Sequence, residues 1–137
     1  LSELLDQLGV DGDGAPDDAH ILFGGPVGRE RGFVLHSEDY DSDGATLNVC
    51  EGVCLTATRD VLHAMTSDTP PEKFVLALGY SGWGAGQLES ELAENVWLVG
   101  IPDPALVYDP SLGTKWSRGL ARIGVSPDKL QVTGGRA

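Results

Sequence analysis

Residues 73–94 read KFVLALGYSGWGAGQLESELAE. The first eight residues are the most apolar run of the chain, and they predict a strand buried on both faces of a sheet. A glycine-rich turn follows at residues 82–86. Leu88 and Leu92 are one helical turn apart, so they predict a helix over about residues 87–94. This stretch therefore predicts a strand, a tight turn and a helix in succession.

Apolar periodicity predicts further short elements on both sides of this unit. Helices are expected at residues 2–8, 59–65 and 113–123, and strands at 21–23, 33–36, 46–49, 53–56 and 96–99. Residues 11–18 read as an acidic loop, Pro102, Pro104 and Pro110 predict another loop, and the tail is irregular or holds one short strand near Leu130. The elements lack regular βαβ spacing, which indicates an α+β fold.

Composition limits the classes of partner. The 137 residues suit a single domain, and 9 basic against 21 acidic side chains give a net charge of −12. Such a charge repels nucleic-acid phosphates and anionic lipid headgroups. A membrane-spanning helix needs about 20 apolar residues, and no run of this length is present. The sequence thus argues against direct nucleic-acid binding and against a membrane protein.

The glycine-rich turn is the first candidate binding site. Glycines at the start of a helix leave backbone amides open to an anion. The turn lacks the lysine of a phosphate-binding P-loop and the last glycine of a dinucleotide-binding motif. The alternative is a purely structural tight turn under Trp83. If the turn binds a ligand, the contacts come from Gly82, Trp83, Gly84, Gly86 and Gln87.

A second candidate is the pair Arg29 and Arg31, expected in a loop after Gly24-Gly25-Pro26. Two nearby guanidinium groups can form a fork for a carboxylate or phosphate. The alternative, which we favour at this point, is that they pair with the protein's own acidic side chains. The two glycine-rich loops together define the predicted binding surface for a small anionic ligand or a protein partner.

The sequence motifs give little support for a catalytic site or a metal site. Ser81 in Gly-Tyr-Ser-Gly-Trp resembles a nucleophile elbow, but the elbow needs glycine where Trp83 stands. His36, at the end of a predicted strand, is expected to be a hydrogen-bonded structural residue. No histidines or cysteines have metal-ligand spacing, so no metal or cofactor is expected. A hydrolase using Ser81 stays an alternative.

One helix could contact DNA. Lys115, Arg118 and Arg122 lie on one side of the helix expected at residues 113–123. Three phosphate contacts would change the affinity for DNA by only about 40-fold between 50 and 200 mM salt, which is a weak salt dependence for a DNA-binding protein. A solvated helix face is the expected alternative.

Several motifs, in order along the chain, resemble the bacterial YqgE/AlgH family. They are FGGPV at 23–27, RGFVLH at 31–36, GVCLT at 52–56 and LGYSGWGAGQLE at 78–89, followed by Glu91 and Trp97. The resemblance implies one α+β domain over residues 1–137, with a mixed, strongly curved, half-barrel-like sheet and short helices around it. It also implies a cytoplasmic location and the absence of an N-terminal segment found in other members, which would leave an open sheet edge.

The resemblance supplies no catalytic residues. One branch of the family is described as a regulator of alginate production. We therefore expect a non-enzymatic module that binds a small ligand or a protein, with a transcriptional regulator and a Ser81 hydrolase as alternatives.

Overall fold

The computed structural model describes residues 1–9, 11–13, 15 and 19–130. The chain divides into two compact units, Leu1–Ser81 and Gly82–Ala137, which we describe separately. The acidic loop predicted at residues 11–18 lies partly outside the described residues, as does any strand that continues beyond Leu130. In the part of the chain that is described, no helix is long and apolar enough to cross a membrane.

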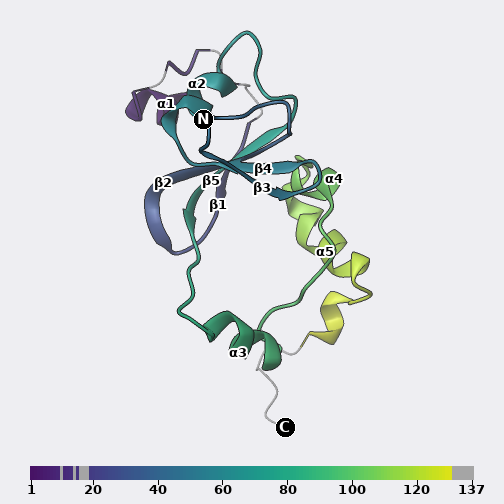
Figure 1. The fold of residues 1–137 in the computed structure, drawn as a ribbon. Helices are drawn as coiled ribbons and strands as arrows, with labels where there is room; N and C mark the ends of the chain where they lie inside the picture. Colours follow the sequence, from purple (N-terminus) through teal and green to yellow (C-terminus); the bar gives the residue numbers. More distant parts are fainter. Residues whose placement is uncertain (10, 14, 16–18, 131–137) are drawn as a thin grey trace. The chain divides into compact units, whose positions relative to one another are not determined.

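The first unit is built on an open, five-stranded sheet with the strand order β1-β5-β2-β4-β3 (Figure 1). β1 runs parallel to β5, and the other pairings are antiparallel. The mixed sheet and the short helices confirm the predicted α+β class. The strands are β1 (Ile21–Phe23), β2 (Val27–His36), β3 (Thr46–Cys50), β4 (Val53–Thr56) and β5 (Phe74–Tyr80).

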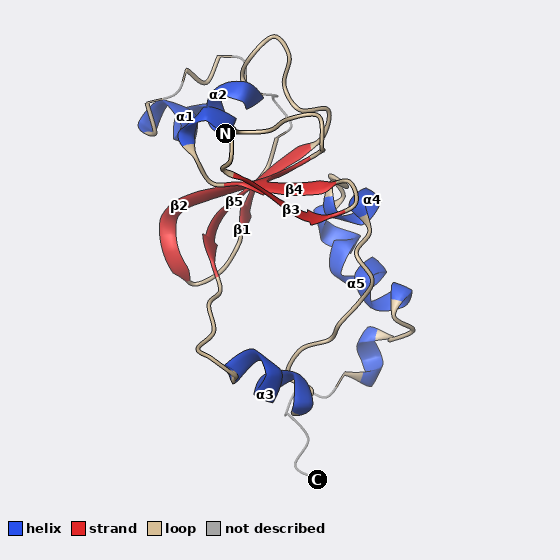
Figure 2. Cartoon of the chain, viewed as in Figure 1, coloured by secondary structure: helices blue, strands red, loops and turns tan. Residues whose placement is uncertain are grey.

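Two short helices, α1 (Ser2–Gln7) and α2 (Arg59–Met65), lie on the same side of this sheet (Figure 2). Val34 of β2 and Leu76 of β5 oppose each other in register, and each is only 1% exposed. They form one core cluster with four helix residues: Leu5, Val61, Leu62 and Met65. Burial of a side chain of this size contributes about 1.5–3 kcal/mol, so this cluster holds the helices on the sheet.

The backbones of β1 and β5 touch just after Phe23. A Cβ atom on Gly24 would lie 2.3 Å from the carbonyl oxygen of Gly79, and one on Gly25 would lie 2.2 Å from the carbonyl carbon of Tyr80. Gly79 itself has a φ of +76°, and a Cβ there would lie 2.4 Å from the carbonyl oxygen of Gly25. No side chain fits at such distances. We call this contact of Gly24, Gly25 and Gly79 the glycine crossing.

β2 is longer than the sequence predicts. Its pairing with β5 begins at Val27, which opposes Tyr80, whereas the expected strand covered only residues 33–36. The prediction that Arg29 and Arg31 lie in a loop is therefore wrong, since both are on β2. In the segment VGRERG, which lacks apolar alternation, only Val27 and Gly32 have register partners on β5, and the residues between them are shifted out of register.

The second unit is helical. Its elements are α3 (Gln87–Ala93), α4 (Pro104–Val107), α5 (Leu112–Arg122) and a 3₁₀ turn at Pro127–Lys129. The helices predicted near residues 87–94 and 113–123 are confirmed. The strand predicted at residues 96–99 is wrong: in the described part of this unit no strand is present, so these β-prone residues have no partner for main-chain pairing.

α4 was missed because prolines were read as loop residues. Pro104 occupies the first turn, where its missing N–H costs no hydrogen bond. Asp103 caps the helix, since its carboxylate accepts from the amide of Ala105 at 3.1 Å. Asp-Pro at the start of a helix is thus the signal that would have found α4.

The glycine crossing predicts a large effect of a single methyl group. Gly25→Ala should destabilise the first unit by about 3 kcal/mol, because the new Cβ overlaps the backbone of Tyr80. Gly32→Ala on β2 is the matched control, since its Cβ would meet only Leu76 at 3.4 Å and Leu78 at 4.0 Å. Urea denaturation followed by circular dichroism measures both. Equal effects of the two substitutions would contradict the crossing as a backbone constraint.

Candidate functional site

The most distinctive side-chain arrangement of the first unit joins two arginines to three aromatic rings. The guanidinium carbon of Arg29 lies 5.2 Å from the ring centre of Phe23. That of Arg31 lies 5.7 Å from the ring centres of both Phe33 and Tyr80. Distances below about 6 Å are typical of cation–π contacts. We call these five residues the arginine–aromatic surface.

The shape of β2 positions this surface. Val27 opposes Tyr80 and Gly32 opposes Leu78, so the intervening residues of β2 bulge past Gly79 alone. Gly28 adopts a φ of +56°, and a Cβ on it would lie 3.1 Å from the Tyr80 ring. The Tyr80 ring also makes an edge-on contact with Phe33, at 5.6 Å between centres. The Arg31 guanidinium group, just before Gly32, thus lies beside both of these rings.

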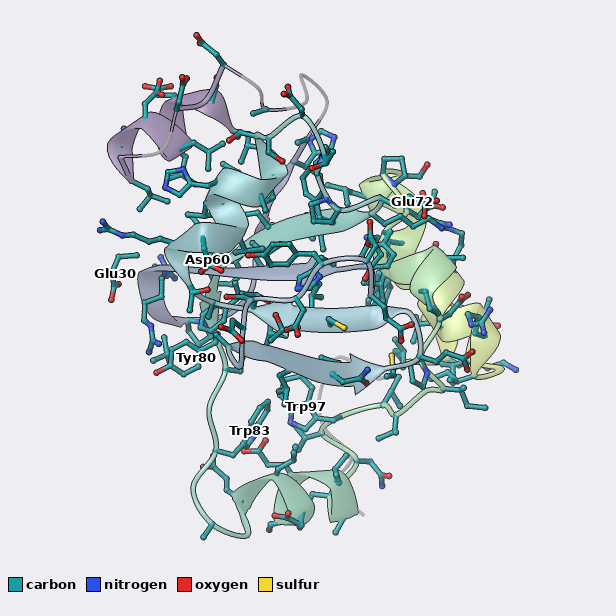
Figure 3. All side chains as sticks on the ribbon, turned by 45° about the horizontal axis from the view of Figure 1, so that its top comes forward. Glu30, Asp60, Glu72, Tyr80, Trp83 and Trp97 are labelled. Carbon is teal, nitrogen blue, oxygen red and sulfur yellow. The ribbon has the colours of Figure 1, made fainter. Side chains whose placement is uncertain are left out.

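The electrostatics of the two arginines are unusual for this chain. Residues 1–81 contain 15 of the 21 acidic side chains and 4 of the 9 basic ones. Both ion pairs found among the described residues nevertheless lie in the second unit. The expectation that Arg29 and Arg31 pair with the protein's own acids is therefore wrong for the described residues. Glu30, between them, projects outward from β2 and is exposed (Figure 3).

His36 is fully buried and hydrogen-bonded through both ring nitrogens. Its Nδ1 lies 2.8 Å from the carbonyl oxygen of Ser37, and its Nε2 lies 2.8 Å from Oγ1 of Thr56. A carbonyl oxygen can only accept, so Nδ1 carries a proton and donates to the carbonyl oxygen of Ser37, while Nε2 is hydrogen-bonded to the Thr56 hydroxyl. The expected structural role of His36 is confirmed. Among the described residues, Ser81 forms no hydrogen bond with a histidine.

A second polar group ties the loop after β2 to α2. Asp60 accepts hydrogen bonds from the hydroxyl groups of Ser42 and Tyr40, the latter at 2.7 Å. The hydroxyl groups of Ser42, Thr58 and Tyr40 hold the pKa of Asp60 well below its usual range. Burial, followed by the hydrogen bond to Asp60, raises the pKa of Tyr40 to about 12. Tyr40 also packs edge-on against His36, at 5.2 Å between ring centres.

In the second unit, the glycine-rich turn is tied to α3 by its own side chains. The amide of Gly84 donates to Oε1 of Gln87 at 3.0 Å. The Glu91 carboxylate accepts from the indole N–H groups of Trp83 and Trp97, at 2.9 and 2.7 Å. Figure 3 labels the two tryptophans. These bonds, that of Trp97 first, hold the pKa of Glu91 below its usual range. The Gly84 amide is thus taken, and a negative charge already lies beside the turn.

The basic side of α5 is also used internally. Lys115 donates to the carbonyl oxygen of Val107 at 2.8 Å, Arg118 pairs with Asp109 at 2.7 Å, and Arg122 pairs with Asp103 at 2.8 Å. All three cations thus hold α5 against the segment that contains α4. The expected helix face is thus engaged in intramolecular contacts, although the Arg118 and Arg122 side chains stay 39% and 49% exposed.

A cavity that the sequence did not indicate lies beside α5. Its volume is about 520 Å³, and its walls include Trp97, Ile101, Leu106 and Trp116. Arg122 and Asp103, which also line it, are paired with each other. The cavity therefore offers apolar contact and no free charge.

A group of proteins described as AlgH-like matches residues 1–128 of this chain. The chain belongs to the AlgH-like family. It is 53% identical to a UPF0301 protein of Caulobacter vibrioides over 137 residues, which cover 98% of this chain and 70% of that protein. A UPF0301 protein of Afipia carboxidovorans is 46% identical over 142 residues, covering 98% and 68% of the two chains.

An AlgH structure also matches. The solution structure of the AlgH protein from Pseudomonas aeruginosa has a TM-score of 0.73 and 40% sequence identity, and the match covers 100% of this chain and 72% of that one. These comparisons confirm the resemblance stated from the motifs. The names of these AlgH-like relatives state no activity, so the function of this member has to be argued from its own residues.

The predicted ligand-binding residues of this AlgH-like chain fall in both units. Arg29 and Arg31 belong to the first unit, where the structure joins them to aromatic rings. The residues of the turn, Gly82, Trp83, Gly84, Gly86 and Gln87, belong to the second. A single site containing both groups stays a prediction. Sequence reasoning missed Phe23, Phe33 and Tyr80, although aromatic residues next to arginines in a strand pattern are a usable signal.

Acid should weaken the contact between Asp60 and its hydroxyl donors. Because the folded-state pKa of Asp60 is lowered, its contribution is complete above the ordinary pKa of 3.8 and is lost progressively below it. Asp60→Asn should lower the free energy of unfolding at pH 7 by about 1 kcal/mol, a modest value because the carboxylate is exposed. This difference from the wild type should shrink at pH 2.5 in urea denaturation. A constant difference would contradict the assignment, and Asp68→Asn is the control.

The indole bonds of Glu91 give a spectroscopic prediction. Glu91→Gln should change the near-ultraviolet circular dichroism of the AlgH-like chain, because Trp83 and Trp97 lose the charged acceptor that fixes their mutual geometry. Glu89→Gln on the same helix is the matched control. If both variants change the tryptophan signal equally, Glu91 does not organise the two rings.

Proposed function

We propose that this chain is a binding module, without catalytic activity of its own, that recognises an anionic group through the arginine–aromatic surface. The observation that carries the proposal is that Arg29 and Arg31 lie on aromatic rings with no carboxylate partner among the described residues. In a unit so rich in acidic side chains, unpaired arginines are unexpected. Their charge is therefore available to a ligand.

Stacking prepares an arginine for such a role. A guanidinium group that lies on a ring still directs its edge N–H groups outward, and these match the two oxygens of a carboxylate or phosphate. The ring also restricts the motion of a long side chain, which reduces the entropy lost on binding. Phe23 is 69% exposed, so apolar surface lies next to the charge. The surface thus suits an anion attached to an apolar or aromatic body.

The alternatives draw less support from the geometry. Direct DNA binding depended on the cations of α5, which are engaged within the second unit. A hydrolase depended on Ser81, which has no histidine partner in the described residues. A regulator that acts through a partner protein agrees with the same surface. We therefore place the binding function on Arg29 and Arg31 and leave the capped turn out of it.

The proposal predicts which small probes bind. Phenylacetate and phenyl phosphate should shift the backbone amide resonances of β2 and of Tyr80 in nuclear magnetic resonance titrations, whereas benzyl alcohol should not, because it lacks the charge. Arg31→Gln should weaken phenylacetate binding by about tenfold, the loss expected for one charge-assisted hydrogen-bonded contact.

Arg59→Gln is the matched control, since Arg59 is an exposed arginine on α2 in the same unit. It should leave binding unchanged. Equal shifts by benzyl alcohol and phenylacetate, or equal losses in the two variants, would show that the arginine–aromatic surface does not recognise anions.

A further inference from the structure

Tyr80 lies on the face of the sheet that strict strand alternation would deny it. Phe33 of β2 opposes Ala77 of β5, so the side chains of these two residues share a face. Regular alternation along β5 would place Tyr80 on the other face. Its ring nevertheless contacts that of Phe33, at 5.6 Å between ring centres. Gly79, whose φ is +76°, interrupts the alternation between Ala77 and Tyr80.

The Tyr80 ring and the Arg31 side chain are packed over a residue without a side chain. The guanidinium carbon of Arg31 lies over the Tyr80 ring, 5.7 Å from its centre. A Cβ atom on Gly28 would lie 3.1 Å from Cε1 of Tyr80 and 3.3 Å from Cδ of Arg31. The bulge of β2 therefore leaves room for this ring and this cation to lie together.

The hydroxyl group of Tyr80 is available beside this cation. Among the described residues, nothing is hydrogen-bonded to it, whereas the Tyr40 hydroxyl is bound to Asp60 at 2.7 Å. Tyr80 is half-buried. In the described part of the chain, the only buried side-chain nitrogen or oxygen without a partner belongs to Arg118, so the Tyr80 oxygen is accessible. A phenolic hydroxyl donates well to an anionic oxygen.

The positions of the two donors favour one shape of anion. The hydroxyl group lies in the plane of the Tyr80 ring, whereas the guanidinium carbon lies over the ring. A carboxylate that binds the guanidinium fork uses both oxygens in the plane of the fork. A phosphate group has a third oxygen outside that plane, which can accept from the hydroxyl. With charge-assisted hydrogen bonds of about 2.7 Å on each side, one phosphate group spans two donors that are separated in this way.

We propose that Tyr80 determines the specificity of the arginine–aromatic surface, because its hydroxyl group donates to a phosphate monoester that Arg31 binds. This inference rests on the proposed function, since it uses the same arginine as the anion site. It narrows the ligand from anions in general to phosphate monoesters with an apolar or aromatic body. The 15 acidic side chains of residues 1–81 oppose a dianion at long range. Salt screens this repulsion beyond about 8 Å at physiological ionic strength, but it hardly weakens direct hydrogen bonds.

Three probes with the same benzyl body test this specificity on the whole chain by nuclear magnetic resonance titration: phenylacetate, benzylphosphonate and phenylmethanesulfonate. Tyr80→Phe keeps the ring and removes only the hydroxyl group. It should weaken the binding of benzylphosphonate by about tenfold and that of phenylacetate by less than about twofold. The sulfonate is tetrahedral but carries the single charge of phenylacetate. Its binding should weaken by about threefold, which separates the shape of the anion from its charge.

Tyr40→Phe is the matched control, because it removes a hydroxyl group elsewhere in the same unit. It should leave the binding of all three probes unchanged. Far-ultraviolet circular dichroism checks that both variants are folded. The side-chain resonances of Arg31 should be the same in Tyr80→Phe as in the unaltered chain, since the ring that holds the arginine is kept.

The carbon atom that bears the hydroxyl group gives an independent readout. In a chain labelled with ¹³C at Cζ of tyrosine, the Tyr80 resonance should shift when benzylphosphonate is added, and the Tyr40 resonance should stay in place. An unchanged Tyr80 resonance at saturation would contradict the contact, even if the probe binds.

The outcomes separate the two proposals. If Tyr80→Phe weakens phenylacetate and benzylphosphonate binding equally, or changes neither, the role of Tyr80 in specificity is wrong while anion recognition stands. The same holds if phenylacetate binds and benzylphosphonate does not. If Arg31→Gln leaves the binding of both probes unchanged, or if no probe binds, both proposals are wrong.

Discussion

The backbone contact between Gly24–Gly25 and Gly79–Tyr80 is the constraint on which the first unit depends. Hypothetical Cβ atoms on Gly24, Gly25 and Gly79 would lie 2.2–2.4 Å from backbone atoms, so the two strands can come this close only because these positions are glycine. This approach places Phe23 on one side of β5 and the bulged start of β2 on the other. The same contact sets Tyr80 beside Arg31. The glycines therefore determine the position of the arginine–aromatic surface without taking part in it.

Apolar periodicity in the sequence predicted most of the helices and strands. The elements α1, α2, α5 and most strands follow from spacing, and the buried, hydrogen-bonded role of His36 follows from its position at a strand end. The first half of β2 could not be predicted, because residues 28–31 lack apolar alternation and bulge between the paired residues Val27 and Gly32. The strand prediction at residues 96–99 was wrong because these residues have strand propensity but the described part of their unit contains no partner strand. The predicted curvature of the sheet stays a prediction.

The arginines of the two units have different contacts. In the second unit, Arg118 and Arg122 pair with Asp109 and Asp103, and exposed pairs of this kind stabilise only weakly. In the first unit, Arg29 and Arg31 lie on rings although acidic residues are abundant. The arginines were identified from the sequence, but their aromatic partners were not, because the partners come from three different strands. The AlgH-like fold thus explains the position of the arginine–aromatic surface, and the charge of this surface comes from Arg29 and Arg31.

The central claim is that the aromatic rings hold Arg31 in place in the free protein. Ring currents move protons above an aromatic face to higher field, so the side-chain resonances of Arg31 test this most directly. In the free chain they should lie clearly upfield of those of the exposed Arg59, and Tyr80→Leu should move them back. Arg31 resonances that coincide with those of Arg59 in the unaltered chain would contradict the account.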